Sequence, residues 1–194
     1  ELNINFQNTT DYGFRYELGL ILSGYRNEVK KLASNQFISN TYTRTEVGHP
    51  ISSFYGYVID GIFQTQGEVD SHVEQSDKAI GRWKYRDVNN DGKIDSQDRA
   101  YIGNPHPDFE YSLSSRFYYK NFDLSLYIQG SQGNDICFAS KGGRDGLDFW
   151  GDYFNKSTRI LNTWTPENRN AELPEINILN PNDEAGKVSS YLIE

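Results

Sequence analysis

Sulfur is almost absent from this sequence. Its 194 residues contain one cysteine, Cys137, and no methionine. A single thiol excludes an internal disulfide framework, and without a second cysteine or a nearby histidine pair it also excludes a Cys/His zinc site. Because the chain begins at Glu1, lacks methionine and ends on an apolar run at residues 191–193, we expect it to be a piece of a larger protein. Any targeting segment is then expected upstream of Glu1.

Long apolar runs and an excess of basic residues are missing too. No stretch approaches the ~20 apolar residues of a membrane helix, which excludes a helical membrane protein but leaves a membrane β-barrel open. The net charge of -8 argues against nucleic acid as a partner, because phosphates require a basic face. Only 36% of the residues are hydrophobic, and 14% are aromatic, so rings carry much of the apolar surface.

Catalytic patterns are lacking as well. The three histidines are His49, His72 and His106, and two of them stand beside proline in turn-like sequence, where surface residues are commoner than bases. No G-x-S-x-G nucleophile elbow occurs. Judged by what a reactive site requires, the sequence predicts that the protein is not an enzyme.

The most specific local pattern is the stretch DVNNDGKIDSQD at residues 87–98, which matches the D-x-[DN]-x-[DN]-G order of a calcium loop. Ca²⁺ takes about 6–8 oxygen ligands, and Gly92 permits the sharp turn that aims them inward. We therefore expect a structural Ca²⁺ here, although Asn-Asn-Asp-Gly is also what an ordinary tight turn uses. The expected ligands are the side chains of Asp87, Asn89, Asp91, Asp95 and Asp98 and the backbone carbonyl of Lys93.

This loop ends in Asp98, where a glutamate is usual, so the shorter side chain must draw the loop closer or bind through one oxygen. Its flanks are short, aromatic and closed by glycine and proline. A helix-loop-helix calcium sensor is therefore disfavoured, and we expect a clasp between extended segments.

Strand periodicity is clear in four places. Apolar and polar residues alternate with a period of two at residues 2–6, 14–23, 109–120 and 122–129. The last two runs are separated only by the turn at Lys120-Asn121 and have matching faces, which predicts a hairpin.

The connections between these strands are short, long, short and then long again. The first long connection covers residues 26–107, far beyond an ordinary loop, and the second covers residues 132–190. Within the second, the spacing of Trp150, Phe154, Leu161 and Trp164 predicts a helix between residues 147 and 164, stopped by Pro166.

Alternating strands, short turns on one side and long loops on the other are typical of membrane β-barrels. A soluble β-sandwich predicts the same alternation, but the rhythm of connections favours the barrel. We expect an all-β chain forming part of a large antiparallel transmembrane barrel, with long extracellular loops and one short helix. The expected interfacial rings are Tyr16, Phe109, Tyr111 and Tyr119, and the expected lumen-facing residues are Arg15, Glu17, Arg116, Asp123, Tyr127 and Gln129.

Three segments together resemble one known family. They are VGHPISSFYGYVIDGIFQ at 47–64, YRDVNNDGKIDSQDRAYIGNPHPDF at 85–109 and YKNFDLSLYIQGSQGNDI at 119–136. Their order and spacing are similar to those of the SusC/RagA-like TonB-linked outer-membrane transporters of Bacteroidetes. The departures are small: Ser112 stands where the family more often has glycine, and Cys137-Phe138 replaces a commoner aromatic-Asn pair.

The resemblance implies that residues 1–194 are a C-terminal fragment of such a barrel, in the outer membrane of a Gram-negative bacterium and in contact with its lipid. It implies TonB-driven import of oligosaccharides (carbohydrate uptake) or peptides. A SusD-like surface lipoprotein would act as the lid, and the TonB complex would contact parts of the protein outside this chain.

Several aromatic residues are candidates for stacking against sugar rings, since an aromatic face suits the apolar face of a pyranose. The alternative for each is packing within the loops. The candidates are Trp83, Trp150, Trp164, Tyr55 and Tyr57. A different overall hypothesis is a soluble, calcium-stabilised β-rich module that binds glycan without transporting it.

Overall fold

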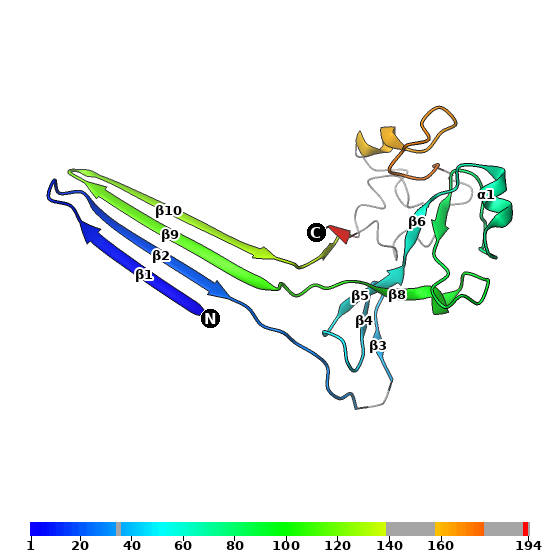
Figure 1. Cartoon of the computed structure of the whole chain (residues 1–194), viewed down its shortest axis with the longest axis horizontal. Coiled ribbons are helices and arrows are strands. Elements are labelled where there is room, and N and C mark those ends of the chain that lie inside the picture. The colour runs from blue at the N-terminus through cyan, green and yellow to red at the C-terminus, as the bar shows by residue number, and fades with distance from the viewer. Residues whose placement is uncertain (34–35, 139–157, 177–191, 194) are drawn as a thin grey trace.

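The computed structural model describes residues 1–33, 36–138, 158–176 and 192–193. One long antiparallel sheet forms an arm, and a compact group of short elements, here called the loop unit, lies beyond one end of it (Figure 1). None of the helices in the described ranges is long and apolar enough to cross a membrane.

The long sheet consists of the four predicted strands. In spatial order they are β1 (Leu2–Thr9), β2 (Arg15–Ser23), β9 (Phe109–Tyr119) and β10 (Phe122–Gln132), and every neighbouring pair is antiparallel. The predicted hairpin is confirmed, because Tyr119 pairs with Phe122 across the two-residue turn, where Lys120 has a positive φ of 54°. Both short turns lie at the end of the sheet far from the loop unit (Figure 1).

The register of the sheet gathers the apolar residues on one face. One row, Ile4, Leu20, Leu113 and Ile128, crosses all four strands by direct pairing. These side chains are 49%, 38%, 38% and 54% exposed, although each has an apolar neighbour on the adjacent strand. The described residues therefore leave a broad apolar sheet face open, which an isolated protein in water rarely shows.

The opposite face of the sheet is polar. A row of Gln7, Glu17, Arg116 and Ser125 crosses it next to a row of Asn5, Gly19, Ser114 and Tyr127. The residues predicted to share this face are all found on it by strand alternation, and they are Arg15, Glu17, Arg116, Asp123, Tyr127 and Gln129.

The long connection between β2 and β9, residues 26–107, has secondary structure of its own, which its sequence did not reveal. It contains a second four-stranded sheet, made of β3 (Ile38–Ser39), β4 (Thr43–Thr45), β5 (Ser53–Tyr57) and β8 (Arg99–Gly103). It also contains a two-stranded ribbon of β6 (Ile59–Ile62) and β7 (Trp83–Tyr85). Strands of two to five residues are too short for alternation to stand out in the sequence.

A short helix, α1 (Gln66–Ser71), lies between β6 and β7 and was not predicted. Thr65 caps it, since its hydroxyl accepts a hydrogen bond from Glu68 N at 3.2 Å. The Glu68 carboxylate in turn accepts from Gln64 N at 3.1 Å. The order Thr-x-x-Glu is a recognised start signal for helices, so this element could have been found.

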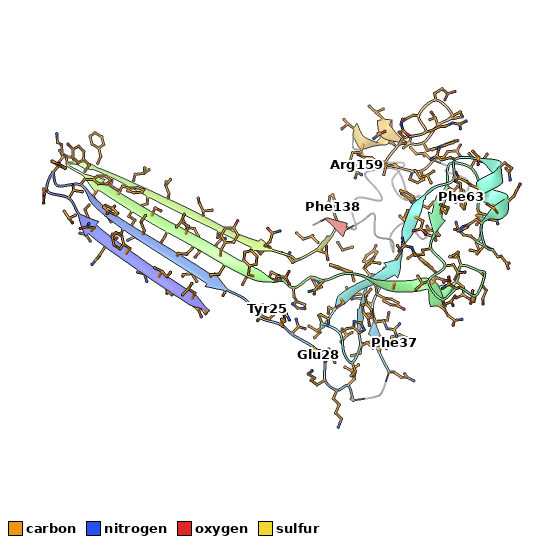
Figure 2. All side chains as sticks on the ribbon, in the orientation of Figure 1. Tyr25, Glu28, Phe37, Phe63, Phe138 and Arg159 are labelled. Atoms are coloured by element: carbon orange, nitrogen blue, oxygen red, sulfur yellow. The ribbon has the colours of Figure 1, made fainter. Side chains whose placement is uncertain are left out.

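The core of the protein is in the loop unit. Tyr57, Ile62, Trp83, Tyr85 and Trp164 form one buried cluster. The partly buried residues packed against it are Ile59, Ile80, Ile94 and Ala171. Phe63, labelled in Figure 2, directly follows Ile62 in the chain and is fully buried. Aromatic rings thus supply most of the buried apolar surface of this core.

Beyond β10, the structure describes β11 (Ile136–Cys137) paired with β12 (Leu192–Ile193), and a 3₁₀ helix η3 (Thr158–Asn162). Most of the helix predicted at 147–164 lies outside the described residues. In its described part the prediction is wrong, because η3 ends at Asn162 and Thr163 pairs with Leu173 in an isolated bridge. That bridge requires extended backbone, and Leu161 points to solvent with 83% exposure.

Candidate functional site

The predicted calcium loop is a tightly hydrogen-bonded turn between β7 and β8. The Asp87 carboxylate accepts from Asp91 N at 3.3 Å and from Gly92 N at 3.0 Å. Gly92 has a φ of +87°, the left-handed conformation that favours glycine. The first half of the segment is thus wrapped around the side chain in the first ligand position.

The second half of the loop is closed by Asp98, which is fully buried. Its two carboxylate oxygens accept from Val88 N at 2.9 Å and from Asp95 N at 2.8 Å. Asp95 in turn caps the 3₁₀ helix η1 (Ser96–Asp98). Asp98 therefore ties the start of the loop to its end, and the two amides compensate the burial of its charge.

A lysine ammonium occupies the position between two of the predicted ligands. Lys93 Nζ lies 2.7 Å from Asp95 Oδ2 and 3.9 Å from Asp91 Oδ2. The hydrogen bond to Asp95 raises the pKa of Lys93, and the same contact lowers the pKa of Asp95. No three His, Cys, Asp or Glu side chains in the described part of the chain are arranged to hold a metal.

The donor types nonetheless fit Ca²⁺, because the predicted ligands are all hard oxygens. The four carboxylates and the side-chain amide of Asn89 all belong to this one loop. Glu74 contacts the loop through its backbone. Glu74 N donates to Gly92 O at 3.0 Å, and Ile94 N donates to Glu74 O. The loop is thus attached to the segment after α1, and Ile94 packs on the aromatic core.

Most of the aromatic residues proposed as sugar platforms are packed inside the protein. Trp83, Tyr57 and Trp164 are only 5%, 6% and 6% exposed and belong to one cluster. Such buried rings offer no free face to a sugar, so the structure gives them the packing role that was the alternative in the sequence. Trp150 lies outside the described residues.

Tyr55 is partly exposed and belongs to a cluster that sequence patterns did not reveal. The Tyr55 ring meets the Tyr101 ring edge-on, with 5.2 Å between their centroids. The His49 ring stacks on the Tyr101 ring, with 3.7 Å between those centroids. Tyr101 Oη donates to Glu46 Oε2 at 2.7 Å, and Arg44 Nε lies 3.0 Å from the same oxygen. The Tyr101 hydrogen bond is the main cause of a lowered pKa at Glu46, while burial raises the pKa of Tyr101.

The two long connections are joined in the loop unit although they are far apart in sequence. Trp164 Nε1 donates to Gln64 Oε1 at 2.9 Å, and Glu175 N donates to Gly81 O at 2.8 Å. Leu173 is 2% exposed. Residues 158–176, here called the strap, therefore pack on the first connection as part of its fold.

A small polar junction links the long sheet to the loop unit. Tyr25, which follows β2 and is labelled in Figure 2, is hydrogen bonded to His106 Nδ1 at 3.2 Å. His106 Nε2 lies 2.9 Å from Ile51 O, and because a carbonyl oxygen can only accept, Nε2 is the donor in that hydrogen bond. This junction orients the unit relative to the strands.

The rings on the apolar face of the sheet gather toward the two strand ends. Near the short turns, Phe14 stacks with Tyr16 at 5.9 Å and with Phe117 at 6.1 Å. At the loop-unit end, Phe109 and Tyr111 are 6.3 Å apart. The middle of the same face is aliphatic, as the row through Leu20 and Leu113 illustrates.

Comparisons with known proteins point in one direction. The chain is 30% identical over 187 residues to the TonB-dependent receptor P26 of Formosa agariphila, covering 90% of this chain and 18% of that protein. It is 26% identical over 152 residues to the TonB-dependent receptor SusC of Bacteroides thetaiotaomicron, covering 71% of this chain and 14% of that protein. No family model matches.

The fold agrees with these relatives. The structure of the RagAB peptide transporter superposes with a TM-score of 0.67 at 18% identity, covering 98% of this chain and 20% of that one. The chain therefore spans between 14% and 20% of the length of the proteins that it matches. These relatives are named as TonB-dependent receptors and as a peptide transporter, and this chain is similar to one part of each of them.

Proposed function

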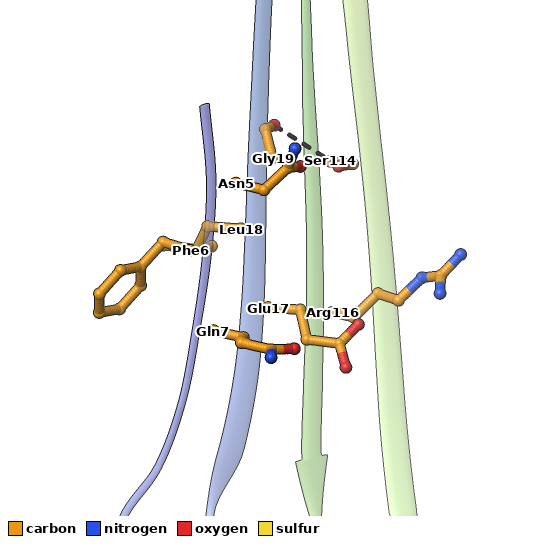
Figure 3. Close-up of a pocket in the computed structure, with 8 residues that line it drawn as sticks. All are labelled: Asn5, Phe6, Gln7, Glu17, Leu18, Gly19, Ser114 and Arg116. Carbon is orange, nitrogen blue, oxygen red and sulfur yellow. Dashed lines mark hydrogen bonds between the residues drawn. The ribbon is translucent and has the colours of Figure 1, made fainter. Parts of the chain in front are cut away.

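We propose that this fragment of a SusC-like transporter supplies four strands of an outer-membrane barrel and a folded unit at its extracellular mouth. The whole protein would import oligosaccharides or peptides under TonB control, with a SusD-like lipoprotein as lid. The observation that carries the proposal is the long sheet, which has one exposed apolar face, one polar face (Figure 3) and both short turns at the same end.

The physical argument rests on how such a sheet can be accommodated. A membrane barrel strand places apolar side chains toward lipid, polar ones toward a hydrated lumen, and aromatic rings at the two interfaces. Phe14 and Tyr16 at one end and Phe109 and Tyr111 at the other follow that distribution. The outer strands β1 and β10 would pair with further strands of the whole protein, since an open edge is unstable.

The loop unit supports an extracellular role because it is a folded body. Its aromatic core and the docked strap give it a fixed shape, which a lid or a solute could contact. Tyr55, beside Arg44 and Tyr101, is the one proposed sugar-stacking residue that is described and not buried. We place solute contact at Tyr55.

The test uses the full-length transporter in its own bacterium. Uptake of labelled oligosaccharides and peptides should be lost when TonB is deleted, and the transporter should fractionate with the outer membrane. Retention of uptake without TonB would contradict the proposal. Recovery of the full-length protein in the soluble fraction, with glycan binding intact, would favour the soluble module.

For residues 87–98, we propose a structural Ca²⁺ held by the oxygen donors named above. The ion would supply the positive charge that Lys93 provides in this structure, and the half-exposed Lys93 side chain can turn to solvent. A bound cation would then pin the loop against Glu74 and the aromatic core.

Hydrogen exchange of this loop in the full-length protein tests the ion directly. Calcium should slow exchange relative to chelator in the wild type and should do little after Asp91→Ala. Lys93→Ala should exchange faster than wild type only in chelator, because calcium replaces the lost ammonium. Equal exchange of the wild type in calcium and in chelator would show that no cation is needed.

A further inference from the structure

The bond between Asp91 and Gly92 lies in the exposed part of the loop at residues 87–98. An aspartate followed by glycine cyclises more readily than other pairs, because glycine has no side chain to hinder attack on the preceding carboxyl group. Gly92 has open space around its missing Cβ, and the Asp91 side chain is 33% exposed. Packing therefore shields this bond neither from reaction nor from water.

The Asp91 carboxylate is folded back along the chain toward the Gly92 peptide. Asp91 Oδ1 accepts a hydrogen bond from Lys93 N at 3.1 Å, which is the turn that an aspartate side chain forms with the amide two residues on. Since the Gly92 peptide lies between these two groups in the chain, the carboxyl carbon of Asp91 is held near Gly92 N. Holding two reacting atoms close together removes much of the entropic barrier to their reaction.

The Asp87 carboxylate restrains the nitrogen that would react. Gly92 N donates to Asp87 Oδ2 at 3.0 Å, and Asp91 N donates to Asp87 Oδ1 at 3.3 Å. An amide nitrogen attacks through the face of its peptide plane, because its lone pair is delocalised perpendicular to that plane. The Gly92 peptide must therefore rotate before a bond can form, and this rotation breaks its hydrogen bond to Asp87.

We propose that Asp91-Gly92 is a site of spontaneous isoaspartate formation and that the Asp87 carboxylate slows the reaction. Gly92 N forms a bond to the carboxyl carbon of Asp91, and one carboxyl oxygen leaves as water with the amide proton and one proton from solvent. Water then opens the five-membered ring at either carbonyl. Opening at the side-chain carbonyl restores aspartate, whereas opening at the main-chain carbonyl leaves the chain running through the side chain. The reaction requires no cofactor, oxidant or bound cation.

Isoaspartate at position 91 would disrupt the loop. It adds one methylene group to the main chain, so the contacts of Gly92 O and Ile94 N with the Glu74 backbone no longer match. The spacing of the oxygen donors also changes, and Ca²⁺ coordination depends on that spacing. The effect on Ca²⁺ rests on the proposed function, but the reaction itself does not. Through its own hydrogen bonds, the folded loop thus delays an irreversible loss of its geometry.

A second Asp-Gly pair, Asp60-Gly61 in β6, provides a reference within the same chain. Gly61 pairs with Lys84 of β7, and Asp60 Oδ1 accepts from Arg86 Nε at 2.9 Å. The ribbon and this ion pair restrain Asp60 without any contribution from the loop at residues 87–98. Global unfolding would release both Asp-Gly pairs, whereas local opening of the loop releases only Asp91.

The experiment incubates the full-length transporter in heavy-oxygen water with a chelator present throughout. Every ring opening leaves a heavy oxygen at the site, so mass spectrometry of peptides measures the reaction at Asp91 and at Asp60 separately. A synthetic peptide of residues 85–98 gives the unrestrained rate. We expect the wild-type protein to react at Asp91 more slowly than the peptide. Asp87→Ala should raise the rate at Asp91 about tenfold, the effect of losing one or two hydrogen bonds, and leave Asp60 unchanged.

Asn89→Ala is the matched control. Asn89 exchanges two hydrogen bonds of 3.0 Å with Asp91, but its loss leaves Gly92 N bound to Asp87, so the rate should rise less than in Asp87→Ala. The proposal is overturned if the wild-type protein reacts as fast as the peptide, or if the peptide forms no isoaspartate. It is also overturned if Asp87→Ala reacts no faster than the wild type or than Asn89→Ala. Equal acceleration at Asp91 and Asp60 would assign the effect to global unfolding and would equally reject the role of Asp87.

Discussion

Trp164 and Gln64 are joined by a hydrogen bond of 2.9 Å from the indole Nε1 to the amide Oε1, although one hundred residues separate them. The Trp164 ring lies in the aromatic core and is 6% exposed. This contact fixes the strap on the first long connection and makes one folded unit from two loops.

Trp164→Phe tests that hydrogen bond while keeping most of the ring. The loss leaves Gln64 Oε1 partly buried without its donor, which costs about 1–2 kcal/mol of local stability. Hydrogen exchange across residues 158–176 should therefore become about tenfold faster in the full-length protein. Leu161→Ala is the control, because Leu161 lies on the same strap and is 83% exposed. Equal acceleration by both variants would contradict the assignment.

Gly81→Ala tests the fit of the strap against the first connection. Gly81 has a φ of +84°, and a Cβ there would stand 2.7 Å from Trp164 Cε3 and 3.0 Å from Glu175 Cβ. We expect the strap to undock and its exchange to exceed that in Trp164→Phe. Gly48→Ala separates clash from backbone strain, since Gly48 has a φ of +90° with open space around its missing Cβ. If the two alanine variants loosen the strap equally, the close packing at Gly81 does not hold the strap in place.

The long sheet could be predicted because its information is local. In β2, every second residue from Tyr16 to Leu22 is apolar, and these four positions place one face of the strand against an apolar environment. Register then follows from the short turns, as the pairing of Tyr119 with Phe122 shows.

The loop unit could not be predicted because its information is non-local. Trp83 and Tyr57 are buried by Trp164, which comes about eighty residues after Trp83, and no spacing rule links them. A single sequence does not distinguish an aromatic residue with an exposed ring from one that is buried in the core.

The pH dependence of the loop unit should be set in part by Glu46. Its folded pKa is lowered, chiefly by the hydrogen bond from Tyr101, so ionised Glu46 favours the folded state. That stabilisation is fully present above the ordinary pKa of 4.5 and is lost as the pH falls through the lower folded value. We expect protection of β5 and β8 against hydrogen exchange, corrected for intrinsic rates, to fall below about pH 4.5 in the wild type.

Glu46→Gln should remove this acid dependence, because an amide cannot titrate. Glu28→Gln is a suitable control, because Glu28 is a half-exposed acid that pairs with Lys30. An unchanged pH profile in Glu46→Gln would show that another carboxyl is responsible.

Leu20 and Ile21 are adjacent on β2, face opposite sides of the sheet and are almost equally exposed, at 38% and 39%. If the apolar face meets lipid, Leu20→Arg should cost about 2–4 kcal/mol near the bilayer midplane, because a charge there loses its water. Ile21→Arg places the same charge on the polar face, where a hydrated lumen would solvate it. We therefore expect Leu20→Arg to reduce folded, heat-modifiable transporter in outer-membrane fractions several-fold and Ile21→Arg to leave it near the wild-type amount.

The pair is matched in strand, size and exposure, so only the face differs. Equal loss in both variants would mean that the apolar face does not meet lipid, and a greater loss in Ile21→Arg would mean that the two faces have been assigned the wrong way round.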